Sequence, residues 1–302
     1  MKLIRFISSN LLVWVVVFAV IAYIFPDLFR IFKPSINWFF ATAMFGIGLV
    51  LKSEDYRNIF KSPISVLFGT LCQFTIMPGL SFLIGKLMKL PDEWLLGLVI
   101  AGSAPGAMTS NVISYLSKAD VAYSVSLTTV ATMLSPVLTP LITLFLVGRD
   151  IPVGFWPMFK TIAYTVVVPL FAGFIIRKIF PKAISRIDDI PSLISVISIV
   201  IITSFVVAAN VDSISKATGL VLGAVILVNL LGMVLGYYSG NLFAFSFKRK
   251  KTLAIEIGMQ NAGLGVVLAI THFNSNVAVP AAIFTIWCII SATLFTKIIA
   301  KH

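Results

Sequence analysis

Glu256 is the residue whose type and position most clearly indicate chemistry in this chain of 302 residues. The chain has 11 Asp and Glu residues, and Glu256 is the only one inside an apolar stretch, the segment 252–265. An ionisable group at membrane depth costs at least about 2.5–3.5 kcal/mol, so it usually has a function and a partner. No Lys or Arg lies in a neighbouring apolar core. The partner is therefore either a proton or a bound cation.

Neutral oxygen atoms inside other apolar segments could surround such a cation. Ser124 and Thr128 are four residues apart, so they share one face of a helix. One carboxylate with amide and hydroxyl oxygens suits sodium, whereas a divalent ion usually requires more carboxylates. Taken singly, a Ser or Thr could instead bond to its own helical turn, Gln73 could tie two helices together, and Glu256 could be a protonated structural acid. The candidate oxygen-bearing residues are Gln73, Thr109, Ser110, Asn111, Ser124, Thr128, Gln260 and Asn261.

The composition indicates which elements position these residues. Hydrophobic residues make up 59% of the chain and charged residues 11%, which is more apolar surface than a soluble domain can bury. Apolar runs of membrane-spanning length recur along the whole sequence. We therefore predict an all-α integral membrane protein with ten transmembrane helices. The predicted spans are 8–25, 35–51, 64–86, 94–116, 121–147, 156–178, 190–210, 217–243, 251–271 and 277–298.

The 23 Lys and Arg residues predict the orientation in the membrane. The net charge of +12 would also fit a nucleic-acid partner, but the basic residues cluster in short loops on alternate sides, which is typical of membrane orientation. Most of them fall on the side that holds both termini. We predict that both termini are cytoplasmic, that the protein lies in the inner (plasma) membrane, and that its first span is a retained helix.

The two halves of the chain, 1–150 and 151–302, would each contain five helices. An odd number of helices per half gives the halves opposite orientations, as in the inverted repeats of secondary transporters. Each half has a disrupted fourth helix, at 103–111 and at 256–265, and paired interruptions are typical of a transporter's binding site. A break frees carbonyls for a cation and helix N-termini for an anion. Pro105 could also be an ordinary kink, and close helix packing is the alternative role for Gly258, Gly263 and Gly265.

The stretch 255–264, with its Glu-x-Gly-x-Gln-Asn motif, resembles the signature of the bile acid:sodium symporter family. Pro105-Gly106, Ser110-Asn111-Val112, the run 117–124 and Ser135-Pro136 are similar to the helix 4–5 region of that family. The resemblance covers essentially the whole chain. It implies a panel domain of helices 1, 2, 6 and 7 and a core domain of helices 3–5 and 8–10. Within the core, the discontinuous helices 4 and 9 would cross.

The same resemblance implies two sodium sites that share Glu256. The first site maps onto Ser110, Asn111, Ser124, Thr128 and Glu256. The second maps onto Gln73, Glu256, Gln260 and the carbonyls near Ile257 and Met259. The substrate would lie between panel and core, in contact with Asn261 and with the region of Met108 and Thr109.

We therefore predict a sodium-coupled symporter of an organic anion, either of the bile-acid type or a small carboxylate such as pantothenate. It would work by alternating access as a monomer, with no nucleic-acid partner and no enzymatic activity. The alternative is a proton-coupled carrier with Glu256 as the proton site, although a proton needs no cage of neutral oxygens. A channel or membrane sensor is less favoured, because channels usually repeat pore rings around a symmetric assembly.

Overall fold

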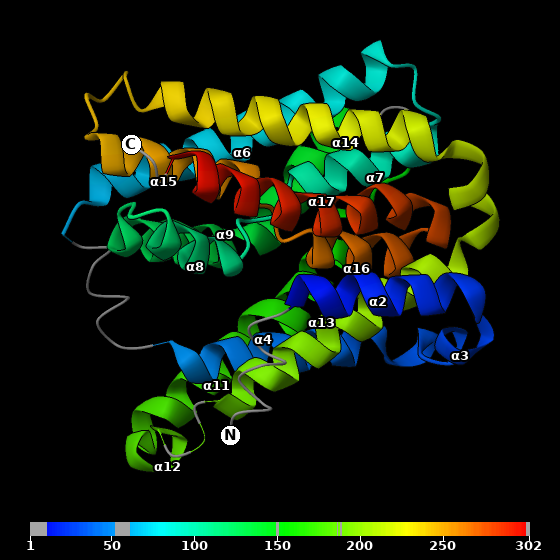
Figure 1. The fold of residues 1–302 in the computed structure, drawn as a ribbon, viewed down its shortest axis with the longest axis horizontal. Helices are drawn as coiled ribbons and strands as arrows, with labels where there is room; N and C mark the ends of the chain where they lie inside the picture. Colours follow the sequence, from blue (N-terminus) through cyan, green and yellow to red (C-terminus); the bar gives the residue numbers. More distant parts are fainter. Residues whose placement is uncertain (1–10, 52–60, 149–150, 186, 188, 300–302) are drawn as a thin grey trace.

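The computed structural model describes residues 11–51, 61–148, 151–185, 187 and 189–299. Helices account for the regular secondary structure of this part of the chain, and the strand-like pairing found in it is one isolated bridge. Most of the long helices run side by side (Figure 1). The predicted start of the first span at residue 8 and the boundary between halves at 150 lie outside the described residues. So do several basic residues used for the orientation, namely Lys2, Arg5, Lys52, Arg57, Arg149, Arg186 and Lys301.

Local sequence explains several helix ends in the first half. Pro26 follows the end of the first helix, and Pro63 is the first residue of α6, a position that tolerates its missing N–H. The Asp120 side chain caps α9 by accepting a hydrogen bond from the Tyr123 backbone N–H at 3.1 Å. The helices are α2 (Leu11–Ile24), α3 (Asp27–Arg30), η1 (Lys33–Ser35), α4 (Ile36–Val50), α6 (Pro63–Leu87), α7 (Asp92–Gly102), α8 (Thr109–Leu116) and α9 (Val121–Val147).

The second half contains a wide helical turn that the sequence analysis did not predict. The π-helical segment η2 (Ala163–Val167) lies just before Pro169, which cannot donate to the carbonyl four residues earlier. The remaining helices are α10 (Phe155–Ile162), α11 (Val168–Ile179), α12 (Pro181–Ser185), α13 (Asp189–Ala209), α14 (Val211–Ser239), α15 (Phe247–Gly258), α16 (Ala262–His272) and α17 (Ser275–Ile299).

Each predicted range contains a helix or a broken pair of helices, but some bounds differ. α14 begins at Val211 rather than at 217, and α15 begins at Phe247 rather than at 251. Three basic residues that the predicted spans left in a loop therefore lie in the first turn of α15, namely Lys248, Arg249 and Lys250. The Ser246 hydroxyl caps this turn. By length and apolarity, six of the described helices can cross a membrane. The number is up to seven if α2 and the α3–α4 segment, bent by 111°, form one span.

Arg249 joins three helix starts at one end of the molecule. Its Nε donates to Asp120 Oδ2 at 3.1 Å, and its Nη atoms donate to the hydroxyls of Ser65 and Ser62 at 3.2 Å each. The starts of α6, α9 and α15 therefore meet there. The Asp120–Arg249 pair is partly exposed, so we attribute to it a role in positioning rather than a large contribution to stability.

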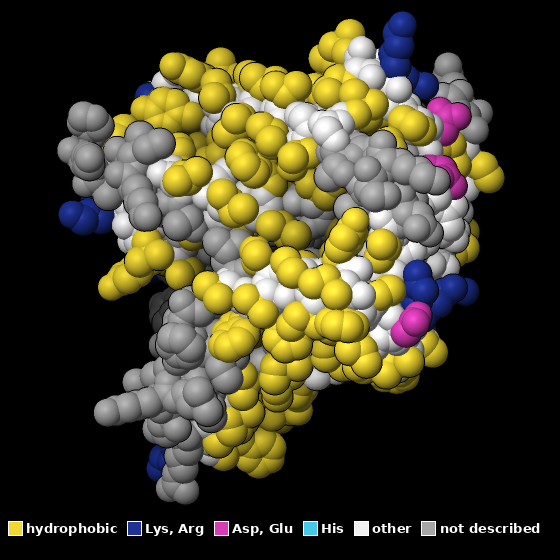
Figure 2. Space-filling model, turned by 45° about the vertical axis from the view of Figure 1, so that its right-hand side comes forward, with side chains coloured by type: hydrophobic (Ala, Val, Ile, Leu, Met, Phe, Trp, Pro, Cys, Tyr) yellow, Lys and Arg dark blue, Asp and Glu magenta, His cyan; other side chains and the backbone are white. Residues whose placement is uncertain are grey.

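Hydrogen bonds also connect helix ends at the opposite end of the molecule. Asn274 and Asn276, at the start of α17, donate to the Glu93 carboxylate at 2.7 and 3.1 Å. The Thr271 hydroxyl donates to Asn37 Oδ1 at 2.9 Å, which links α16 to the start of α4. On the face drawn in Figure 2, hydrophobic side chains cover the middle, whereas charged side chains lie toward the edges. This surface fits a protein that spans a membrane.

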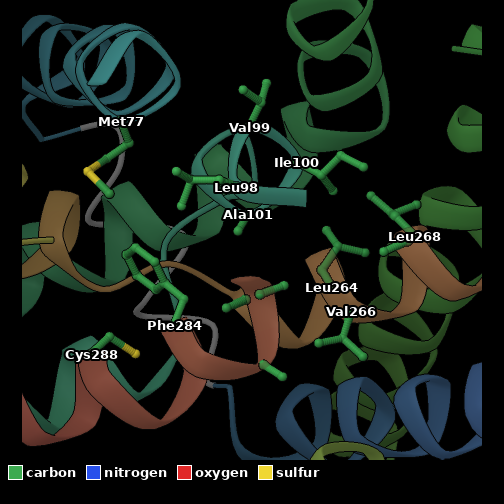
Figure 3. Close-up of a cluster of buried hydrophobic side chains, with 14 of the residues drawn as sticks. Met77, Leu98, Val99, Ile100, Ala101, Leu264, Val266, Leu268, Phe284 and Cys288 are labelled. Carbon is green, nitrogen blue, oxygen red and sulfur yellow. The ribbon is translucent and has the colours of Figure 1, made fainter. Parts of the chain in front are cut away.

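The helices pack in two groups that the ribbon drawing separates. α4 packs mainly on α11 and α13, and α13 also packs on α2, in the lower part of Figure 1. The upper part contains α6, α7, α14, α16 and α17, with α7 packed against α6, α16 and α17. Figure 3 shows the centre of this packing, where Leu98 and Ala101 of α7 lie near Leu264 of α16 and Phe284 of α17. All four side chains are buried, so the cluster holds the second group together.

We predict that Gly97→Ala destabilises the protein, because α7 and α17 approach too closely at this position for a side chain. A Cβ atom at Gly97 would lie 1.9 Å from the Val277 carbonyl oxygen, so a backbone would have to move. Overpacking of this kind costs about 1–3 kcal/mol. The measurement is the thermal unfolding midpoint in detergent. Gly79→Ala is the matched control, since a Cβ there meets nothing within 4 Å. An unchanged midpoint in Gly97→Ala would contradict this packing.

Candidate functional site

Two helix breaks cross each other and pair through their backbones. The break between α7 and α8 covers 103–108, and the break between α15 and α16 covers 259–261. Gly106 and Gln260 form an antiparallel bridge. The Ala107 N–H donates to the Met259 carbonyl at 2.7 Å, and the Asn261 N–H donates to the Pro105 carbonyl at 2.8 Å. Each break therefore satisfies backbone groups that the other leaves without a helical partner.

Side chains complete the capping of the broken helix ends. The Gly258 carbonyl, at the end of α15, accepts a hydrogen bond from Asn229 Nδ2 of α14 at 2.8 Å. Asn229 Oδ1 in turn accepts from the Trp287 indole N–H of α17 at 3.0 Å. The Asn261 side chain caps α16 by accepting from the Leu264 N–H at 3.3 Å. The break is thus held from both neighbouring helices.

The glycines near the second break mainly permit close packing. A Cβ atom at Gly258 would lie 2.3 Å from Met233 Cγ, and one at Gly265 would lie 3.2 Å from the Ala101 Cα atom. Both glycines lie inside helices, and the unwound residues fall between them. The structure therefore favours the packing alternative for these glycines. Gly106 is different, because a Cβ there would lie 2.8 Å from Glu256 Oε2 and intrude on the site.

Glu256 lies beside the crossing, within the last turns of α15, and only 2% of its surface is exposed. The hydroxyls of Ser110 on α8 and Ser124 on α9 donate to its Oε1 atom. The Thr128 hydroxyl donates to its Oε2 atom at 2.9 Å. Asn111 Oδ1 lies 2.9 Å from the Ser124 hydroxyl and 3.4 Å from that of Thr128. The five residues predicted for the first sodium site therefore lie together.

Oxygen atoms in this cluster outnumber the protons available to them. Each of the three hydroxyls carries one proton, whereas the carboxylate and the Asn111 carbonyl only accept. The Ser124 hydroxyl is within hydrogen-bonding distance of both Glu256 and Asn111, yet it can donate to one acceptor at a time. Among the described residues, the hydrogen bonds to Glu256 come from neutral groups. An oxygen-rich, net negative cluster of this kind suits a small hard cation.

A second group of polar residues lies near Glu256. Gln73 Nε2 of α6 donates to Gln260 Oε1 at 2.8 Å, and Gln260 Nε2 donates to the Ile257 carbonyl at 2.9 Å. Gln73 and Glu256 both line a small cavity together with Gly106. The Gln73 Oε1 atom is buried, with no hydrogen-bond partner among the described residues. The side chains predicted for the second sodium site therefore also lie together, and an unpartnered oxygen there fits a cation.

The residues predicted to contact substrate line another, mainly apolar cleft, and Gln260 lines it too. Met108, Thr109 and Asn261 lie on its wall at the crossing. Phe40 of α4 and Thr203 of α13 contribute to the opposite wall. The cleft thus lies between the two groups of helices, beside the sites around Glu256. Both α8 and α16 begin at the crossing, so the partial positive charge of each N-terminus is located there.

Two polar residues of the site were not predicted from the sequence. Asn229 supports the end of α15, and Thr70 lines the cavity beside Glu256. The signal available for Asn229 was an amide in a long apolar segment, which is costly to leave unpaired. Thr70 gave no comparable signal, because a threonine in a membrane helix usually bonds to its own turn.

Two broken helices that cross beside a buried carboxylate, in an apolar helical protein, define a membrane transporter. The family model for the sodium bile acid symporter family matches residues 38–217. The chain is 36% identical over 300 residues to "Uncharacterized sodium-dependent transporter YocS" of Bacillus subtilis (strain 168), covering 99% of this chain and 94% of that protein. The chain belongs to the sodium bile acid symporter family, which confirms the resemblance drawn from the motifs.

Plant proteins are also similar along most of the chain. "Probable sodium/metabolite cotransporter BASS1, chloroplastic" of Arabidopsis thaliana is 29% identical over 284 residues, covering 93% of this chain and 70% of that protein. "Probable sodium/metabolite cotransporter BASS2, chloroplastic" of Oryza sativa subsp. japonica is 32% identical over 296 residues, covering 93% of this chain and 68% of that protein.

We predict that Asn229→Ala lowers the thermal unfolding midpoint. The substitution leaves the Gly258 carbonyl and the Trp287 indole N–H without the partners described above. Each buried group left unpaired costs about 1–3 kcal/mol. Asn241→Ala, at an exposed position near the end of α14, is the control and is expected to leave the midpoint unchanged. A wild-type midpoint in Asn229→Ala would mean that this amide does not support the break.

Proposed function

We propose that this protein is a sodium-coupled secondary symporter of an organic anion. The observation that carries the proposal is the buried Glu256 carboxylate, whose hydrogen bonds in the described residues come from hydroxyl groups beside two crossing helix breaks. A bound cation would balance its charge, which neutral donors cannot do. The relatives whose names specify sodium-dependent transport or sodium/metabolite cotransport support sodium as that cation.

Two sodium ions would share Glu256. The arrangement of hydroxyl, amide and carboxylate oxygens around it supports a first site formed by Ser110, Asn111, Ser124, Thr128 and Glu256. The unpartnered Gln73 oxygen and the crossing itself support a second site formed by Gln73, Glu256, Gln260 and the carbonyls of Ile257 and Met259. Each of these two carbonyls already accepts one hydrogen bond and keeps a second lone pair for an ion.

The substrate would bind in the cleft between the two groups of helices. Its mainly apolar lining favours an anion with an apolar body, and the N-termini of α8 and α16 favour a carboxylate near Thr109 and Asn261. Two sodium ions around one carboxylate leave a locally positive region, which attracts an anion. Ions and substrate would then stabilise each other's binding, as reciprocal linkage requires. This coupling is what a symporter needs.

The transport cycle would use two inverted repeats of five spans each, residues 1–150 and 151–302. Each half contains a broken helix followed by a long one, α7–α8 before α9 and α15–α16 before α17, which supports the repeat. Helices 1, 2, 6 and 7 would form the panel, and helices 3–5 and 8–10 the core. Alternating access would come from movement of the core against the panel, in a monomer of the plasma membrane with both termini cytoplasmic.

We predict that Glu256→Ala abolishes sodium-driven uptake. A panel of carboxylates that includes a bile acid, pantothenate and a keto acid is first screened for thermal stabilisation that requires sodium rather than potassium. Uptake of the carboxylate that stabilises the protein only with sodium is then measured in vesicles with a sodium gradient at constant pH. Wild-type-like sodium-driven uptake by Glu256→Ala would falsify its role. Wild-type uptake driven by a proton gradient without sodium would instead support the proton-coupled alternative.

We predict that Asn111→Ala and Gln260→Ala raise the sodium concentration needed for half-maximal uptake. Each removes a neutral oxygen from one of the two sites, which at about 1–1.5 kcal/mol corresponds to roughly a five- to tenfold increase. The check is uptake measured as a function of sodium at saturating substrate. Asn241→Ala, at an exposed position outside both sites, is the control. Unchanged sodium dependence in both variants would count against the ligand assignment.

A further inference from the structure

Two buried oxygen atoms on α6 face the same small cavity. Thr70 Oγ1 and Gln73 Oε1 are buried and have no hydrogen-bond partner within the described residues. The two residues are three apart, so they share one face of α6. Both line the small cavity that also contains Glu256 and Gly106 in its wall. Unpartnered buried polar groups cost free energy, so this pair requires an explanation.

Thr70 also departs from the usual behaviour of threonine in these helices. Thr75 donates to the carbonyl of Leu71 at 2.7 Å, one turn earlier on the same helix. Thr143 and Thr285, on other helices, donate to the carbonyl four residues before them. This back-bonding is the ordinary way to satisfy a threonine in an apolar helix. The Thr70 hydroxyl makes no such bond, so its oxygen remains available to a ligand.

The cavity has the composition of a cation site. Thr70, Gln73 and Glu256 supply oxygen atoms, and the remaining wall is apolar or glycine, including Leu127. A Cβ atom at Gly106 would lie 2.8 Å from Glu256 Oε2 and 3.9 Å from the Met259 carbonyl oxygen. The missing side chain therefore leaves open the space between the carboxylate and that carbonyl. Oxygen atoms converging in an apolar enclosure suit a small hard cation.

We propose that the Thr70 hydroxyl is a further ligand of the second sodium ion. It would bind the ion together with the Gln73 side-chain oxygen and the Glu256 carboxylate. This inference rests on the proposed function and deepens it, because the set taken from the family resemblance contains Gln73, Glu256, Gln260 and backbone carbonyls but not Thr70. Thr70 thereby helps to determine the sodium affinity of this chain.

The test compares two substitutions at Thr70 by sodium titration of the thermal unfolding midpoint. The purified full chain is titrated with sodium chloride in detergent without substrate, and choline chloride keeps the ionic strength constant. Thr70→Val removes the hydroxyl with little change of shape, whereas Thr70→Ser keeps it. Losing one neutral ligand should raise the half-maximal sodium concentration about three- to tenfold in Thr70→Val. Thr70→Ser should stay within about twofold of the wild type, because its hydroxyl remains.

A control variant and a sodium-free measurement separate ligation from a structural role. Thr75→Val, on the same helix but exposed and back-bonded, should titrate like the wild type. In choline alone, Thr70→Val should unfold at or above the wild-type midpoint, because a buried unpartnered hydroxyl is replaced by a methyl group. A lower midpoint in choline with unchanged sodium dependence would show a structural hydroxyl and overturn the proposal.

The possible failures can be told apart. A Thr70→Val variant that titrates like the wild type would overturn the role of Thr70 and leave the sodium-coupled function standing. A wild-type protein without any sodium-dependent shift would overturn both. Sodium binding measured with the radioactive ion gives a readout that does not depend on transport.

Discussion

Backbone groups inside a membrane must find partners within the protein, and this requirement governs the centre of the structure. Interrupting two helices exposes N–H and C=O groups that lipid cannot satisfy. The two breaks meet this requirement by pairing with each other, through Ala107 with Met259 and Asn261 with Pro105. Neither break would be tolerated in that position without the other. The crossing is therefore a structural unit to which both halves of the chain contribute.

In the proposed mechanism, the buried charge of Glu256 binds a cation beside the crossing. Glu256 lies against it, and the hydroxyls around the carboxylate orient it without cancelling its charge. A cation supplied from solution then becomes part of the folded core while it is bound. The binding free energy of the ion can thereby change the relative stability of two arrangements of the helices.

Sequence alone singled out Glu256, because the cost of a charge in an apolar segment can be read locally. It also located both helix breaks, although the glycines in the second prove to serve packing. Grouping the oxygens of Ser110, Ser124 and Thr128 around Glu256 came from the family resemblance, since these hydroxyls lie on α8 and α9, far in sequence from Glu256 on α15. The contacts of Asn229 and the role proposed for Thr70 depend on side-chain orientation, which no local pattern specifies. The π-helical segment η2 before Pro169 was likewise not predicted, because it depends on how α10 and α11 are joined.

The contacts that complete the site have a consequence for biosynthesis. The Arg249–Asp120 pair and the hydrogen bonds of Glu256 to Ser110, Ser124 and Thr128 all connect residues of the second half to residues of the first. A nascent chain whose synthesis has reached the middle therefore has its hydroxyl cluster in the bilayer without the carboxylate it binds. Its α7–α8 break also lacks the backbone partner that arrives with residues 259–261. The first half therefore remains without these contacts, in the membrane or bound to the insertion machinery, until the second half has been synthesised.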